Sequence, residues 1–157
     1  MSVNLFDDAW DEREDDERVP TERILGPLLG STQWGGSLYL VEPGKTMWPY
    51  HWHVGEEEWL LVVAGTPTLR TPHGERVLRP WDVAVFRRGP DGAHQVRNDS
   101  DEPVRVLMLS TISDPEICVY PDSGKIGASG GALRTDGVRV GLRNRPEANL
   151  EYYDGEP

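Results

Sequence analysis

The most informative segment of this 157-residue chain runs from Gly44 to Gly65 and reads GKTMWPYHWHVGEEEWLLVVAG. His51 and His53 are separated by one residue. Residues i and i+2 of a β-strand point to the same face, so both imidazole rings are expected to face one way. Three glutamates at positions 56–58 open the next apolar run. Any of their carboxylates can join the histidine pair across the intervening turn.

A third histidine, His94, opens another short apolar run in Gly92-Ala93-His94-Gln95-Val96. Three imidazoles and one carboxylate suit a single Fe, Mn, Ni, Co, Cu or Zn ion. A metal held from one side keeps positions open for water or substrate. Two histidines spaced this way are more often ordinary polar residues, but here aromatic and apolar neighbours surround them, and a buried polar group needs a partner. The fourth histidine, His73, lies in a predicted hairpin turn and is expected to be exposed.

The chain around these histidines has the pattern of an all-β protein. Short apolar runs alternate with Gly, Pro, Asn and Asp, which is typical of a sandwich or barrel. Evidence for helix is thin and is confined to residues 21–29, where Gly26-Pro27 interrupts the pattern. The predicted strands are Ser37–Glu42, Trp48–His53, Glu57–Val63, Thr68–Thr71, Glu75–Leu78, Asp82–Phe86, Ala93–Arg97, Val104–Thr111 and Ile117–Tyr120.

Residues 44–65 resemble the first motif of the cupin family. That motif has a glycine, then His-x-His, then Glu after three or four residues, then Gly after six more. Glu58 meets both spacings, whereas Glu57 meets only the first. The resemblance therefore implies His51, His53 and Glu58 as metal ligands, with Glu57 as the second choice for the carboxylate.

Residues 90–98, PDGAHQVRN, resemble the second cupin motif. His94 followed by Asn98 has the family spacing, which implies His94 as the fourth metal ligand. The glycine that opens this motif is replaced by Trp81, so the turn expected there is in question.

The resemblance extends over about residues 37–120 and is similar to small bacterial single-domain cupins. It implies a double-stranded β-helix (a cupin or jelly-roll barrel), often dimeric, with one divalent transition metal ion, Fe, Zn, Ni, Mn, Co or Cu, inside. Cupins serve many chemistries, so fold alone does not select a reaction. We expect a mononuclear metal-binding protein that acts on a small organic molecule by oxygenase, isomerase or lyase chemistry, with Glu57 as a candidate base. The alternative is a non-catalytic ligand-binding or sensing cupin whose metal is structural or absent.

Strand parity predicts apolar side chains on both faces of the central strands. If the histidines and Glu58 face inward, Leu60 and Val62 follow them, while Trp48, Trp59 and other large side chains face outward. Large exposed apolar patches are rare in monomers. A second subunit is the expected cover, which predicts a C2 homodimer through this sheet. The chain's own N-terminal segment is the alternative cover.

Composition excludes several classes of protein. The net charge is −11, and phosphate-backbone binding needs a basic field, so no nucleic-acid partner is expected. No run of 18 apolar residues and no signal-peptide pattern occurs, which disfavours a membrane protein and predicts a cytoplasmic location. Cys118 is the single cysteine, so an internal disulfide is excluded. It is expected to be a small buried apolar residue.

Three regions are expected along the chain. Residues 1–20 form an acidic segment, mobile because like charges repel, whose apolar Leu5, Phe6 and Trp10 can pin it to a neighbouring surface. Residues 21–121 form the barrel. Residues 122–157 are expected to be a tail of loops, rich in glycine, that packs on the barrel or on a partner.

Overall fold

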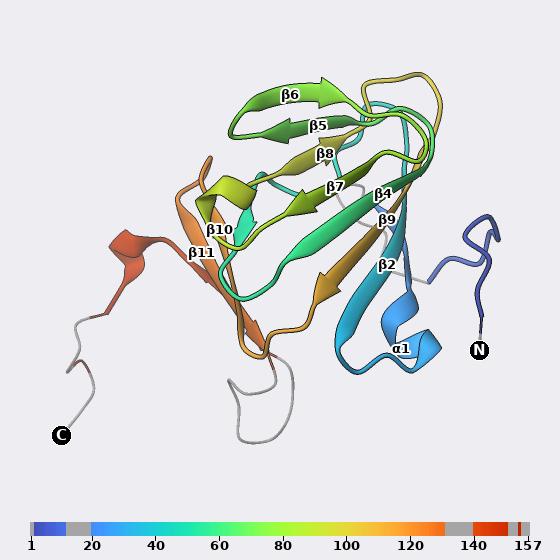
Figure 1. The fold of residues 1–157 in the computed structure, drawn as a ribbon. Coiled ribbons are helices and arrows are strands. Elements are labelled where there is room, and N and C mark those ends of the chain that lie inside the picture. Colours follow the sequence, from blue (N-terminus) through green and yellow to red (C-terminus); the bar gives the residue numbers. More distant parts are fainter. Residues whose placement is uncertain (1, 12–19, 131–139, 151–153, 155–157) are drawn as a thin grey trace.

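A computed structural model describes residues 2–11, 20–130, 140–150 and 154 of the chain. Within them the protein is almost entirely antiparallel β-structure, as predicted (Figure 1). The elements in chain order are β1 (Thr21–Ile24), α1 (Leu25–Leu29), β2 (Trp34–Val41), β3 (Trp52–His53), β4 (Glu58–Ala64), β5 (Thr68–Thr71), β6 (Gly74–Val77), β7 (Val83–Phe86), η1 (Pro90–Gly92), β8 (Gln95–Arg97), β9 (Val104–Thr111), β10 (Glu116–Tyr120), β11 (Lys125–Gly130), β12 (Val140–Asn144) and η3 (Pro146–Ala148).

The strands form three sheets. The largest has the order β1-β2-β9-β4-β7, the second has the order β12-β11-β10-β3, and the smallest has the order β6-β5-β8. The main core lies between them and is built from inward-facing aliphatic side chains such as Leu60, Val62 and Val106, all of them fully buried. This agrees with the predicted parity of β4. The candidate ligands therefore stand at one end of a well-packed apolar interior.

Parity fails for Trp48, which was predicted to face outward. Trp48 instead packs against the core, with its ring edge-on to Tyr39 at a centroid distance of 6.0 Å. The reason is that the predicted strand Trp48–His53 is regular only at its last two residues. Pro49 has no N–H group to donate to a ladder, so the chain bends here and the alternation is lost.

The tail was predicted to be loops, and this is wrong for residues 125–130 and 140–144. These residues form β11 and β12, which extend the sheet outward from β10. Three glycines in the two strands concealed them, because glycine is unfavourable in strands. At Gly127 the absence of a side chain has a structural use: a Cβ atom there would lie 3.4 Å from the Tyr120 ring and 3.5 Å from the Arg143 stem.

The N-terminal segment packs on the outer face of the largest sheet over residues 2–11. Val3, Leu5 and Trp10 contact a small cluster that includes the buried Leu38. Arg105 fixes the segment by donating a hydrogen bond to the Leu5 carbonyl and by an ion pair with Asp8. The predicted mobility of this acidic segment concerns mainly residues 12–19, which lie outside the described residues.

Part of the same outer face stays exposed. Register places Trp59 directly opposite Leu109 on one side and Val85 on the other. These three side chains, with Trp34 and Val83, are 39–52% exposed. The described N-terminal residues therefore cover one end of the face and leave these five apolar side chains open to solvent.

The homodimer stays a prediction, and Trp59→Glu tests it. A carboxylate at the centre of a buried apolar interface costs several kcal/mol, so this variant should be monomeric where the wild type is dimeric. Light scattering coupled to size-exclusion chromatography reports the mass directly. The matched control is Val77→Glu, because Val77 is 64% exposed on β6, outside this face. A monomeric wild type would contradict the prediction.

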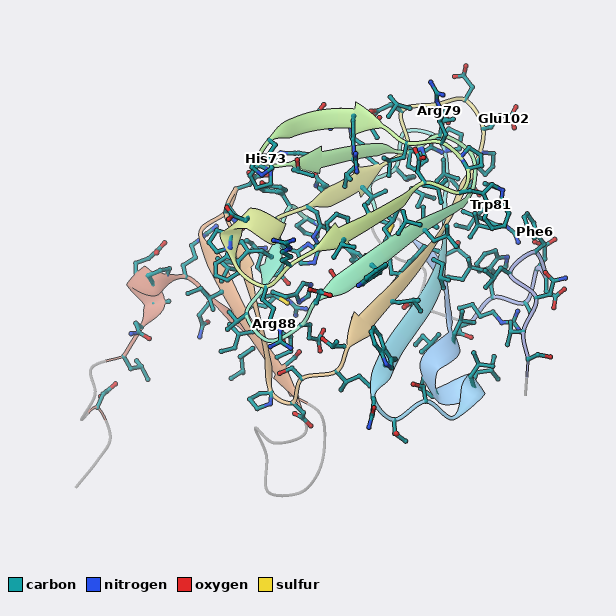
Figure 2. The ribbon with its side chains drawn as sticks, in the orientation of Figure 1. Phe6, His73, Arg79, Trp81, Arg88 and Glu102 are labelled. Carbon is teal, nitrogen blue, oxygen red and sulfur yellow. The ribbon has the colours of Figure 1, made fainter. Side chains whose placement is uncertain are left out.

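The turn that carries Trp81 keeps a glycine-like backbone without a glycine. Trp81 has φ = 73°, in the left-handed region, and its side chain projects from the turn between β6 and β7 (Figure 2). Its N–H group donates to the Val62 carbonyl at 2.7 Å, and the Asp82 N–H group donates to the Arg79 carbonyl at 3.0 Å. These bonds hold a conformation that is unfavourable for a bulky residue.

We expect Trp81→Gly to raise the free energy of unfolding by about 0.5–1 kcal/mol. Glycine removes a left-handed penalty of about 1–2 kcal/mol and loses part of that gain to the greater entropy of the unfolded chain. Urea denaturation measures the change. Trp81→Ala keeps the Cβ atom and hence the penalty, so it should show no such gain. An equal gain in both variants would contradict the explanation from backbone strain.

The structure also bears on membrane association. Among the described residues, we find no helix with the length and hydropathy needed to cross a bilayer.

Candidate metal site

The backbone brings the first and fourth candidate ligands together by direct pairing. His51 and His94 form an antiparallel bridge in which each N–H group donates to the other's carbonyl, at 3.1 and 2.9 Å. Their ring centroids are 4.7 Å apart. His53 follows on β3, with its ring centroid 4.9 Å from that of His51. Two segments whose histidines lie 43 positions apart in the sequence thus present three imidazoles to one point.

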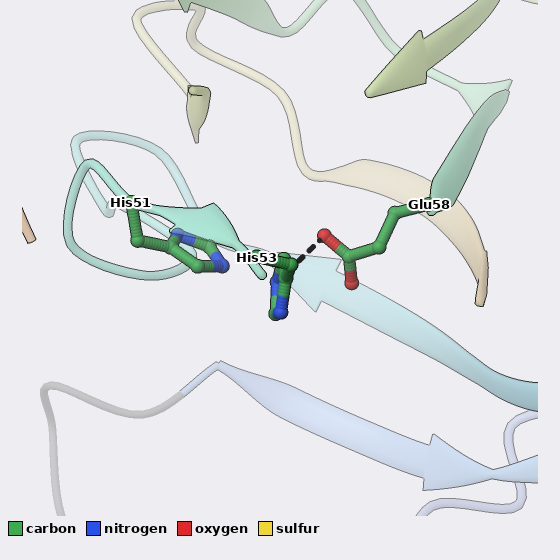
Figure 3. Close-up of side chains that lie close together, drawn as sticks. All are labelled: His51, His53 and Glu58. Atoms are coloured by element: carbon green, nitrogen blue, oxygen red, sulfur yellow. Dashed lines mark ion pairs between the residues drawn. The ribbon is translucent and has the colours of Figure 1, made fainter. Parts of the chain in front are cut away.

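Glu58, at the start of β4, completes the group. Its Oε2 atom lies 3.1 Å from His53 Nε2 and 3.1 Å from His94 Nε2. One ligand atom from each of His51, His53 and Glu58 falls within 4.8 Å of the others. Figure 3 shows the three side chains converging, with the close pair of His53 and Glu58 marked. The structure therefore brings together all four residues that the sequence singled out.

The side chains of the three neighbouring glutamates point in different directions, which distinguishes Glu58 from Glu57 as a candidate ligand. Glu57 accepts a hydrogen bond from the Trp59 indole N–H group, on the outer side of the sheet. Glu56 accepts one from the Ser113 backbone N–H group. Only Glu58 enters the histidine cluster. The Glu57 carboxylate is thus directed away from the cluster, which favours Glu58 over Glu57 as the carboxylate ligand.

Each histidine ring is oriented through its Nδ1 atom. The Pro49 carbonyl lies 2.8 Å from His51 Nδ1, and the Gly92 carbonyl lies 3.0 Å from His94 Nδ1. A carbonyl only accepts hydrogen bonds, so both rings carry their proton on Nδ1 and leave Nε2 with a free lone pair. Phe86 also stacks on His94 at a centroid distance of 3.7 Å. The rings are thus locked with Nε2 facing the cluster.

His53 is oriented by two residues outside the predicted ligand set. Glu116 Oε1 lies 3.3 Å and Cys118 Sγ 3.4 Å from its Nδ1 atom. A carboxylate is the stronger acceptor, so we infer that the His53 Nδ1–H group donates to Glu116. Metal-bound histidines commonly donate to a carboxylate in this way. A Cβ atom at Gly55 would lie 2.5 Å from Glu116 Oε2, so glycine makes room for this carboxylate.

Cys118 is half-buried and contacts His53, so the expectation of a merely apolar buried residue is wrong. No local signal in the sequence could have revealed this role or that of Glu116. Their places depend on the pairing of β10 with β3, where Cys118 stands opposite His53. His73, by contrast, is exposed in the turn between β5 and β6, as predicted (Figure 2).

Electrostatics favour a cation at this point. Burial, and then the neighbouring His94 and His53, lower the pKa of His51 to about 4, so its ring is neutral at pH 7. Burial alone would raise the pKa of Glu58, but the nearby histidines outweigh it and hold that pKa well below its usual range. His51 therefore offers a neutral imidazole nitrogen and Glu58 a carboxylate anion. Against the effect of burial, Cys118 and Glu58 raise the pKa of His53 to about 11, so its ring is protonated at pH 7 and metal binding would release that proton.

Two buried atoms support the fit of a metal ion. His53 Nε2 and Glu58 Oε2 are both buried, and neither makes a well-formed hydrogen bond within the described residues despite their 3.1 Å separation. Buried polar atoms rarely lack a hydrogen-bond partner. Three nitrogens and one oxygen are also the donors that borderline divalent ions prefer. The residues present thus fit a single divalent transition metal.

Beside the ligands lies a small cavity with a volume of about 30 Å³. This is room for an ion or a water molecule, not for an organic substrate. Its lining is mostly apolar: Tyr39, Met47, Trp48, Val96 and Met108, together with His51, Glu58, His94 and Gln95. An organic ligand must therefore approach the metal position from outside this cavity.

Comparisons with known proteins agree with the fold. The Cupin_2 family model, described as a cupin domain, matches residues 37–110. No curated protein sequence matches the chain significantly. A cupin-superfamily sugar phosphate isomerase from Silicibacter pomeroyi superposes with a TM-score of 0.74 at 25% identity, covering 85% of this chain and 81% of that one.

Two further solved structures share the fold. A protein from Acidithiobacillus ferrooxidans, provisionally named a sugar phosphate isomerase, has a TM-score of 0.70 at 27% identity and covers 85% of this chain and 80% of its own. A cupin 2 conserved barrel domain protein from Salinispora arenicola has a TM-score of 0.52 at 22% identity, over 68% of this chain and 92% of its own. The expected double-stranded β-helix is confirmed, and the family match identifies residues 37–110 as a cupin domain.

Proposed function

We propose that this protein is a metal-dependent isomerase that interconverts an aldose phosphate and a ketose phosphate. The observation that carries the proposal is the convergence of His51, His53, Glu58 and His94 on one point beside a small apolar cavity. The similarity to a sugar phosphate isomerase of the same fold supports the choice of isomerase over oxygenase or lyase chemistry.

The four residues would hold one divalent transition metal ion, Fe, Zn, Ni, Mn, Co or Cu. Such an ion supplies Lewis acidity, which polarises a carbonyl or hydroxyl oxygen of the bound sugar. The chain itself fixes the ligand rings through their Nδ1 contacts and surrounds the cluster with apolar side chains. Exclusion of water strengthens electrostatic interactions at the reacting carbons.

The proposed reaction is balanced without any co-reactant. A proton leaves C2 of the aldose and a proton is delivered to C1, while the hydroxyl proton on O2 passes to the former carbonyl oxygen. The overall oxidation state of the sugar does not change. An oxidant or an organic cofactor is not required, which is consistent with a site built only from side-chain ligands.

Proton exchange at C2 tests the proposal. The metal-loaded protein in D₂O is incubated with aldose 5- and 6-phosphates, and proton NMR follows loss of the C2 signal and appearance of ketose. We expect both with wild type and with His73→Ala, and neither with His51→Ala/His94→Ala. Metal-loaded protein that binds a sugar phosphate but gives neither exchange at C2 nor ketose would overturn the isomerase and favour the non-catalytic ligand-binding alternative.

A further inference from the structure

A cationic groove lies at the outer end of the second sheet. It has a volume of about 320 Å³ and is lined by Lys125, Arg143, Asn144, Arg145, Glu147 and Ala148. Three of these side chains are cationic and one is acidic. The whole chain carries a net charge of −11, so its average field repels anions. A local excess of positive charge is therefore the feature by which an anion could bind this protein.

The groove shares a face of the sheet with the candidate metal site. Cys118, whose sulfur contacts His53, stands opposite Gly127, and Gly127 stands opposite Arg143. Tyr120 likewise stands opposite Lys125. Directly opposed residues of antiparallel strands point to the same face. One continuous surface thus runs from β3 across β10 and β11 to β12.

Tyr120 links the two ends of this surface. Its ring stacks on the His51 ring at a centroid distance of 5.9 Å. The Lys125 ammonium lies 5.3 Å from the centroid of the same Tyr120 ring. Gly127 leaves the floor beside Tyr120 without a side chain, where a Cβ atom would meet both the ring and Arg143. Lys125 lies two strands from β3, about 10 Å at the usual strand spacing, a separation that suits a sugar extended between carbonyl and phosphate ends.

The cations of the groove are available for a ligand. Arg70 is committed to a bidentate ion pair with Asp122, and Arg97 to pairs with Glu75 and Asp99. Neither Lys125 nor Arg143 has such an acidic partner within the described ranges. Arg145 uses its Nε–H group to bond the Ser123 carbonyl, which holds the guanidinium in place and leaves its terminal nitrogens free to bind a ligand.

We propose that this groove binds the phosphate group of the substrate, with Lys125 and Arg143 as its principal contacts. That the phosphate belongs to a sugar phosphate rests on the proposed function. The affinity of the groove for inorganic phosphate can be tested independently of that function. The interior cavity is too small for a sugar, so the sugar lies over Tyr120, with its carbonyl end toward His51 and its phosphate in the groove.

The test compares two double variants that each remove two positive charges. Lys125→Gln/Arg143→Gln alters the groove, and Arg76→Gln/Arg79→Gln alters exposed side chains near the turn between β6 and β7 (Figure 2 labels Arg79). Binding of inorganic phosphate is measured by isothermal titration calorimetry at fixed ionic strength. We expect at least a tenfold weaker dissociation constant for the groove variant and less than a twofold change for the control. Equal weakening in both variants, or no phosphate binding by wild type at millimolar concentration, would overturn the proposal.

A second readout separates this proposal from the isomerase itself. His51→Ala/His94→Ala should retain the phosphate affinity of wild type, because the groove does not depend on the metal ligands. Loss of phosphate binding in that variant would overturn a separate phosphate site. Phosphate binding that is lost only in the groove variant supports the groove even if no isomerase activity is found. In active protein, the groove variant should raise KM for the sugar phosphate and leave kcat within a factor of about two.

Discussion

Replacing His51 and His94 together by alanine is expected to remove nearly all bound metal from the protein. Both Nε2 lone pairs are presented to the cluster, and no other described nitrogen replaces them there. Loss of a mere hydrogen-bond partner of a ligand costs about 10- to 100-fold in metal affinity, so loss of two direct ligands should exceed that range. Elemental mass spectrometry of purified protein should give near one transition metal ion per chain for wild type and a trace for the variant.

The matched control for this experiment is His73→Ala, which removes an imidazole from an exposed turn and should leave metal content unchanged. Circular dichroism verifies that the double variant remains folded. Wild-type protein that contains no transition metal, even after reconstitution with each candidate ion, would contradict the metal site. The histidines would then line a pocket for a metal-free ligand.

Asn98→Ala is expected to produce the largest loss of stability among substitutions outside the metal site. Asn98 is completely buried, and its side-chain amide donates to the Val41 and Glu102 carbonyls, each at 2.8 Å. Its side-chain oxygen accepts from the Ser100 backbone N–H and hydroxyl groups. One side chain thus ties β2 to the loop before β9.

Truncation at Asn98 removes one buried and three partly buried hydrogen bonds. A typical hydrogen bond contributes about 0.5–1.5 kcal/mol, so we expect the free energy of unfolding to fall by about 3 kcal/mol. For a chain of this length that lowers Tm by about 6–12 °C. Thermal denaturation with chelator present separates the effect from metal binding. Asn144→Ala, on the exposed outer strand, should lower Tm by far less. A similar fall in both variants would contradict the role assigned to Asn98.

The sequence was sufficient to predict the barrel and the four clustered side chains because three of them lie in one local segment and His94 lies in a second segment that resembles a cupin motif. His51 and His53 lie on one segment, and Glu58 follows across a short turn. Even the doubtful glycine position was informative, because Trp81 adopts the backbone that a glycine would have supplied. The conformation of such a turn depends on a few residues, and here it is retained although one of them is not glycine.

What could not be predicted depends on pairing between distant strands. Glu116 reaches His53 only because β10 lies beside β3, and the cationic groove exists only because glycine-rich residues continue that sheet as β11 and β12. Strand propensity is unhelpful where packing against a neighbour determines the conformation. Trp48 shows the same limit, since Pro49 ends the alternation on which the parity argument relied.

The way the three rings are held gives the metal site one adjustable ligand. His51 and His94 are oriented by backbone carbonyls, which no side-chain substitution can remove. His53 differs from them because its Nδ1 atom faces two side chains, the carboxylate of Glu116 and the sulfur of Cys118. Charge behind an imidazole raises its basicity toward the metal. Changes at position 116 can therefore alter donor strength, and with it the preference among metal ions, while the barrel and the ligand set stay the same.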